Sequence, residues 1–243
     1  MNVLNNKSDF SNLLSALEAK ILLQRLTTLT SNVNAPSTES WKFQKVQYLE
    51  NVKIEWQNLS AIKVIDGAQS FVNKDEQAAT AWLIQLFNTL FAHQNVILVR
   101  GQGDPEYFPA QDNEPAKIEF AHGFFASALH ELSHWCVAGE VRRCLPDFGY
   151  WYAPDGRTAA QQQAFERVEI KPQALECLFT LACERSFEVS QDNLFADFDT
   201  SNSTFANDVY RQVQQYIAEP NMLPRDAKTL LHALLSVCIA DSE

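Results

Sequence analysis

The segment from Phe120 to Glu140 constrains the fold most strongly, because it places polar groups inside an apolar helix. It reads FAHGFFASALHELSHWCVAGE and contains the motif HELSH, from His130 to His134. Residues four apart lie on the same face of a helix, so both imidazoles can reach one metal ion. Glu131 lies about 100° around the helix and can contact a metal-bound water without being a ligand. We therefore predict a divalent metal site on this helix.

An alternative interpretation of HELSH is an amphipathic core helix with two hydrogen-bonded histidines. The segment around the motif is apolar almost throughout, so its histidines and glutamate are expected to be buried. Burying three such groups without partners costs free energy. Gly139 can stop the helix, which lets the backbone turn and bring further polar groups back. These features favour the metal site over the core helix.

Length and charge limit the other possibilities. The chain has 243 residues, 46% of them hydrophobic, which is enough for one large or two small globular domains. No window approaches the ~20 apolar residues of a membrane span, and the first residues lack a secretory signal. The five cysteines show no CxxC spacing and are expected to be reduced thiols of a cytoplasmic protein. A net charge of −11 argues against a nucleic-acid partner.

Hydrophobic periodicity predicts an α+β fold in which a small sheet packs with helices and the HELSH helix is central. Residues 1–75 are expected to form an N-terminal extension, and residues 76–243 the metal-dependent domain. We expect a helix over 10–29 capped by Ser11, and another ending near His93 and capped by Asn73 or Asp75. A buried strand is expected at 95–100, then a long loop and another short strand at 117–120, with weak strands between Trp41 and Val72. Further helices are expected after Pro172, at 209–217 and at 228–239.

The third metal ligand is expected to be a carboxylate from a later element. Glu166 and Glu169 precede Pro172, which can occupy the first turn of the helix that follows. Glu169 is preferred because it stands just before the proline, where an extended residue can point inward. Glu140 is the rival, because a turn at Gly139 could fold it back toward the histidines.

A run of aromatic residues follows the HELSH helix. One interpretation is a surface loop that packs its aromatic rings on the core. The other is a pocket wall in which the aromatic faces, with Asp147 or Asp155, receive an ammonium group. The substrate-binding candidates are Tyr150, Trp151, Tyr152 and Asp155.

Three segments together carry a resemblance to a known family. FAHGFFASALHELSHWCVAGEVRR, DFGYWYAPDGR and FERVEIKPQALE, in that order, resemble the bacterial elongation factor P hydroxylase family. The similarity runs from about residue 79 to about residue 216, and the combination is far more specific than HELSH alone. Residues 1–75 extend beyond the core of the family.

The resemblance implies hydroxylation of the β-lysylated lysine of elongation factor P by a non-haem iron(II) centre, with dioxygen as co-substrate. It implies an α+β fold likened to a metal-dependent endoribonuclease. His130 and His134 carry over as motif histidines, and Glu169 is the carboxylate that we assign. Glu131 is then the catalytic residue that orients a bound water or a ligand histidine. The loop from Tyr150 to Asp155 would hold the lysyl chain.

Two other functions remain possible from the residues. HExxH is also the signature of zinc peptidases, in which Glu131 would be the general base. In a non-catalytic protein, a metal or buried histidines would only hold the fold together. Metal analysis separates these hypotheses, because zinc has no redox chemistry and cannot support hydroxylation.

Overall fold

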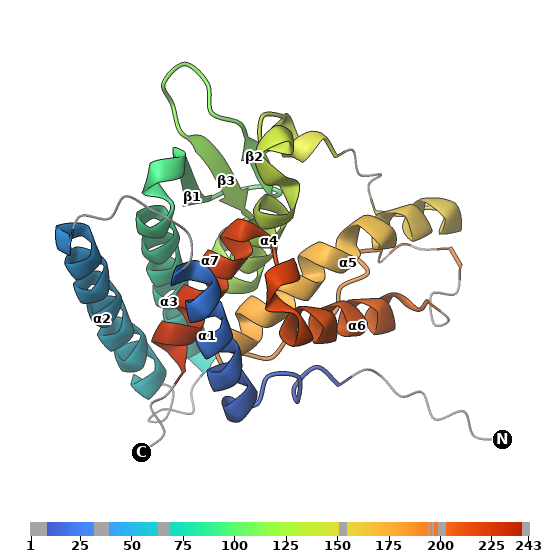
Figure 1. The fold of residues 1–243 in the computed structure, drawn as a ribbon. Coiled ribbons are helices and arrows are strands. Elements are labelled where there is room, and N and C mark those ends of the chain that lie inside the picture. The colour runs from blue at the N-terminus through green and yellow to red at the C-terminus, as the bar shows by residue number, and fades with distance from the viewer. Residues whose placement is uncertain are drawn as a thin grey trace.

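The computed structural model describes residues 9–31, 39–62, 69–150, 155–193, 195, 197–198 and 203–239. Within these residues the predicted α+β class is confirmed (Figure 1). The helices are α1 Ala16–Ser31, α2 Glu39–Ile62, α3 Gln69–Leu90, α4 Phe125–Arg142, α5 Ala159–Ala182, α6 Phe205–Ala218 and α7 Arg225–Cys238. The strands are β1 Val96–Arg100, β2 Glu106–Phe108 and β3 Ala116–Phe120. No helix in the described part of the chain is long and apolar enough to span a membrane.

A small sheet at one end of the molecule leads into α4 (Figure 1). Its strand order is β1-β3-β2, with β1 parallel and β2 antiparallel to β3. Alternate residues of β1 and β3 are buried, among them Leu98 and Ile118, and the sheet packs against α3 and α4. The predicted strands at 95–100 and 117–120 are confirmed, while β2 lies in a stretch expected to be a loop. Only a short turn separates β3 from α4, so the sheet fixes where α4 begins.

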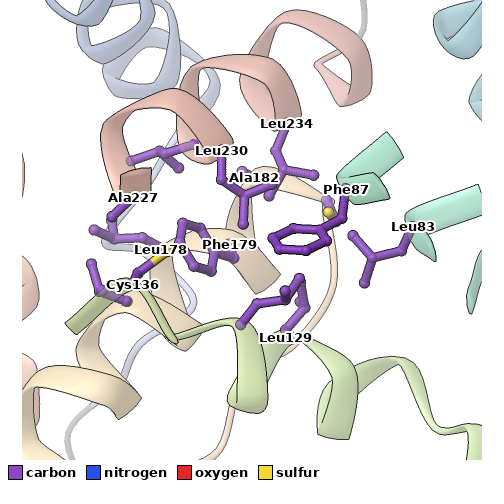
Figure 2. Close-up of a cluster of buried hydrophobic side chains, with 14 of the residues drawn as sticks. Leu83, Phe87, Leu129, Cys136, Leu178, Phe179, Ala182, Ala227, Leu230 and Leu234 are labelled. Carbon is purple, nitrogen blue, oxygen red and sulfur yellow. The ribbon is translucent and has the colours of Figure 1, made fainter. Parts of the chain in front are cut away.

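The main hydrophobic core lies where α3, α4, α5 and α7 meet. Figure 2 shows apolar side chains from all four helices pointing toward one another. The labelled residues are Leu83, Phe87, Leu129, Cys136, Leu178, Phe179, Ala182, Ala227, Leu230 and Leu234. Each is 4% exposed or less, and such burial is the main stabilising contribution to a fold. This core holds α4 and α5 rigidly beside each other.

The N-terminal helices pack on the same core. α1 and α2 contact α7, and α2 also contacts α3. Leu22 and Leu26 of α1 are buried, as is Trp56 of α2. The indole N–H of Trp82 donates to the carbonyl of Val52 over 3.0 Å, which ties α3 to α2. The division of the chain at residue 75 stays a prediction.

The weak strands predicted between Trp41 and Val72 are wrong, because α2 and the start of α3 occupy this region. Tyr48, Val52, Trp56 and Leu59 are spaced three or four residues apart and give α2 an inward apolar face. Short stretches of alternating polarity within α2 suggested a strand. Packing of α2 against α3 and α7 stabilises the helix instead.

The predicted helix starts also need correction. α1 begins at Ala16 rather than at residue 10, and Ser15 rather than Ser11 caps it. The hydroxyl of Ser15 accepts from the Glu18 N–H over 3.3 Å, while the Glu18 carboxylate accepts from the Ser15 N–H over 2.9 Å. α3 begins at Gln69, so Asn73 and Asp75 lie inside the helix and do not cap it.

Candidate metal centre

The two histidines of HELSH lie one turn apart on α4 and face each other. Their Nε2 atoms are 3.0 Å apart. His134 is buried, while the side chain of His130 is 30% exposed. At Gly139 the backbone leaves the helical conformation, with φ of +67°, and then resumes it as far as Arg142. The glycine therefore bends α4 beyond the histidines instead of ending it.

The helix that carries the predicted carboxylate is longer than expected. α5 is one helix that starts from a capping box between Thr158 and Gln161, and Pro172 lies in its interior. The predictions that Pro172 opens a helix and that Glu169 precedes it in extended backbone are therefore wrong. Proline removes one backbone donor, the partner of the Val168 carbonyl. Val168 is 38% exposed, so water can hydrate this carbonyl and the helix continues.

Glu169 projects from α5 toward both histidines and is 1% exposed. Its Oε1 lies 3.4 Å from the Nε2 of His134, and its Oε2 lies 3.8 Å from the Nε2 of His130. One ligand atom from each of the three residues falls within 4.8 Å of the others. The Oε2 atom is buried and has no hydrogen-bond partner among the described residues. A buried carboxylate oxygen in this state is suited to a metal ion.

The donor set fits a non-haem iron site. The Nε2 atoms of His130 and His134 are 3.0 Å apart, close enough for both to bind one ion. Two imidazoles and one carboxylate on one face of an ion are typical of non-haem iron(II) oxygenases.

Comparison with known proteins identifies the family of this chain. The family model described as elongation factor P hydroxylase matches residues 86–241, which include all of α4 and α5. This chain belongs to the elongation factor P hydroxylase family. A curated relative from Haemophilus influenzae, the elongation factor P lysine hydroxylase, is 47% identical over 156 residues. That alignment covers 63% of this chain and 86% of the relative.

In this member of the elongation factor P hydroxylase family, a second carboxylate from α5 supports one of the histidines. The Oε2 of Glu176 lies 2.8 Å from the Nδ1 of His130. This bond makes Nδ1 the donor and leaves Nε2 as the acceptor that a metal needs. Sequence reasoning missed Glu176. It follows Glu169 by seven residues, two helical turns, so treating α5 as one helix would have placed both on one face.

The three carboxylates around the histidines make the site negative. Burial disfavours the charged form of His130, but the carboxylates of Glu176, Glu169 and Glu131 outweigh it and raise the pKa of His130 to about 10. Burial raises the pKa of Glu131. Burial acts in the same direction on Glu169, but the two histidines outweigh it and lower the pKa of that carboxyl. A cation entering this site would therefore meet negative charge and displace the proton of His130.

The rival carboxylates are engaged elsewhere. The side chain of Glu140 is 80% exposed and lies 3.4 Å from Arg225. Glu166 accepts hydrogen bonds from Gln162, Gln191 and Ser203. The structure thus brings Glu169, and neither Glu140 nor Glu166, into the group that could hold a metal.

The predicted aromatic wall is described only in part. Trp151 and Tyr152 lie outside the described residues. The ring of Tyr150 lies 3.8 Å from the guanidinium carbon of Arg142, and Asp155 accepts hydrogen bonds from the N–H groups of Gly156 and Phe195. Asp147 accepts from the N–H of Tyr107 over 2.9 Å. The role of this loop in substrate binding stays a prediction.

Proposed function

We propose that this protein hydroxylates the β-lysylated lysine of translation elongation factor P, with an iron(II) ion held by His130, His134 and Glu169. Membership of the family and the printed name of the Haemophilus influenzae relative support lysine hydroxylation on elongation factor P. One observation carries the iron assignment. Two imidazole nitrogens and a buried carboxylate oxygen without a hydrogen-bond partner converge within 4.8 Å.

The residues around this centre have different proposed roles. Iron, when bound, supplies the redox chemistry with dioxygen that converts a C–H bond into C–OH. Glu176 fixes the ring of His130 so that its Nε2 points at the other ligands. Glu131 lies beside them on α4, and its carboxyl can hold a proton there because burial raises its pKa. The aromatic loop, through Tyr150 and Asp155, is our candidate for contacts with the lysyl chain.

Buried apolar residues lie beside the ligands on α4, while the side chain of His130 stays 30% exposed. Leu129, Leu132 and Trp135 flank the histidines on α4 and are each 1% exposed or less. Excluding water strengthens the electrostatic interactions inside a site and prevents side reactions. Since the proposed substrate is a translation factor, we further propose that the protein acts in the cytoplasm.

The test is oxygen transfer to the protein substrate. Purified full-length protein is loaded with iron(II) without air and mixed with β-lysylated elongation factor P, a reductant and isotopically labelled dioxygen. We expect the intact mass of the substrate to increase by one labelled oxygen atom, and the label to lie on the modified lysine. Protein loaded with zinc is the control and should add no oxygen.

Peptide cleavage by the zinc-loaded protein, with no oxygen transfer by the iron-loaded protein, would contradict the proposal. It would favour the zinc peptidase, in which Glu131 is the general base.

A further inference from the structure

A cavity of about 360 Å³ lies between α3, the start of α4 and the end of α5. Phe125 and Thr180 are buried at its base, and Glu76 of α3 lines one side. The exposed residues Glu184 and Ser186, just after α5, lie at its mouth. Cavities of roughly 300 to 1,000 Å³ hold small molecules or extended side chains.

Two of the residues that line this cavity lie on α4 and α5, one helical turn from His130 and Glu176. α4 and α5 run antiparallel, because His134 pairs with Glu169 and His130 with Glu176. Ala126 precedes His130 by one turn and lines the cavity. Thr180 follows Glu176 by one turn and lines it as well. The cavity therefore begins one helical turn, about 6 Å along each helix axis, from the layer of His130 and Glu176.

Two polar atoms in the cavity lining have no hydrogen-bond partner among the described residues. They are the Oγ1 of Thr180, a residue 6% exposed, and the Nε of Arg185. Buried polar groups are normally paired, and leaving them unpaired costs free energy. Both atoms can donate. A carbonyl oxygen within hydrogen-bond distance of either atom would accept from it.

The charges of the cavity favour a cation over an anion. The guanidinium of Arg185 lies 2.8 Å from one carboxylate oxygen of Glu76, and the other oxygen accepts from the Phe125 N–H over 2.7 Å. The guanidinium also stacks on the ring of Phe125, 4.1 Å away. Glu76 thus compensates the charge of Arg185, and the carboxylate of Glu184 at the mouth leaves the lining negative.

We propose that this cavity binds the aminoacyl extension of the substrate lysine. A carbonyl oxygen of the extension accepts from Thr180 Oγ1 and Arg185 Nε, and a primary ammonium group lies beside Glu184. The proposal rests on the proposed function, because an aminoacylated lysine carries both an amide carbonyl and an ammonium group on a flexible chain. The side-chain carbons of the substrate lysine then extend from the cavity toward His130, one helical turn away.

Binding of two small probes tests the assignment. The probes are Nα-acetyllysine amide and the same compound with a β-lysyl group on its Nε, titrated by calorimetry into the full-length protein. We expect the wild type to prefer the extended probe. Thr180→Val and Glu184→Gln should each reduce this preference by about fivefold, which is the change in affinity expected for the loss of one hydrogen bond. Glu188→Gln, an exposed glutamate outside the cavity lining, is the matched control and should keep the preference.

Stability separates a binding role of Thr180 from a structural one. Because its hydroxyl has no partner, Thr180→Val should leave the melting temperature unchanged or raise it. A merely structural role would leave the probe preference unchanged. Wild-type preference retained in both cavity variants would overturn the assignment, even if the protein hydroxylates elongation factor P. Preference lost in both variants, without oxygen transfer to elongation factor P, would support the cavity and reject the proposed function.

Discussion

Two clusters of polar side chains lie along α4 and at its C-terminal end, and they are built differently. At the end of the helix, Arg143 pairs with Asp226 of α7 over 2.7 Å. The carboxylate of Asp226 also accepts from Gln94 over 2.9 Å, and the guanidinium donates to the carbonyl of Trp135 over 2.9 Å. In this cluster donors meet acceptors and positive charge meets negative charge. It is complete within the protein and connects α4 to α7.

The cluster around HELSH instead brings together three side chains that can act as metal ligands. The Nε2 atoms of His130 and His134 face each other, and a buried oxygen of Glu169 has no hydrogen-bond partner among the described residues. One ligand atom from each of the three residues lies within 4.8 Å of the others, so one cation could bind to all three. The comparison supports our proposal that the HELSH cluster holds a metal, whereas the Arg143 cluster stabilises the fold. Substitutions in the two clusters should therefore affect different properties.

The largest effect is expected from the double substitution His130→Ala, His134→Ala. Metal affinity should fall more than about 100-fold, since even residues behind metal ligands change it by ~10- to 100-fold. Hydroxylation should fall with it. The measurements are metal content after dialysis and oxygen incorporation into elongation factor P. A folded double variant with undiminished activity would show that the histidines are structural.

Asp226→Asn should show the opposite pattern. It leaves the buried guanidinium of Arg143 without its charged partner, so the free energy of unfolding should fall by about 3 kcal/mol at neutral pH. The metal affinity of the folded fraction should not change. Denaturant unfolding and metal titration measure the two quantities. A loss of metal affinity with unchanged stability would remove the distinction between the clusters.

The stability difference between wild type and Asp226→Asn should depend on pH. Burial raises the pKa of Asp226, but the hydrogen bonds from Gln94 and Arg143 outweigh it, so the net pKa is lowered. A carboxyl group with a lowered pKa stabilises the folded state at pH values above its unfolded-state pKa. This stabilisation is lost as the pH falls through the folded-state pKa. The difference should persist at neutral pH and shrink below about pH 4. Unfolding curves at both pH values measure it.

A smaller effect is expected from Glu176→Ala. Without this carboxylate the ring of His130 loses its orienting partner, so metal affinity should fall ~10- to 100-fold. Glu176→Gln should recover part of the loss, because an amide oxygen can still accept from Nδ1–H. Titration with iron(II) in the absence of air measures both variants. Equal affinities for the wild type and Glu176→Ala would show that Glu176 does not position His130.

The sequence predicted the parts of the site that depend on local spacing. His130 and His134 are one turn apart whatever surrounds them, and the apolar residues of α4 indicate a buried helix. Glu169 was chosen for the wrong reason, since Pro172 does not start a helix and Glu169 reaches the histidines from the interior of α5. The partnership of Glu176 with His130 depends on how α4 and α5 pack. That packing is set by long-range contacts that no short segment encodes.

The central claim is that Glu169 completes the metal site of His130 and His134. The most direct test compares the iron(II) affinities of Glu169→Ala and Glu140→Ala with that of the wild type. We expect the iron(II) affinity of Glu169→Ala to fall about 10-fold or more, because even residues that hydrogen-bond to metal ligands change the affinity by this factor. Glu140→Ala should retain the wild-type affinity. Unchanged affinity in Glu169→Ala with a loss in Glu140→Ala would contradict the account and assign the carboxylate to Glu140.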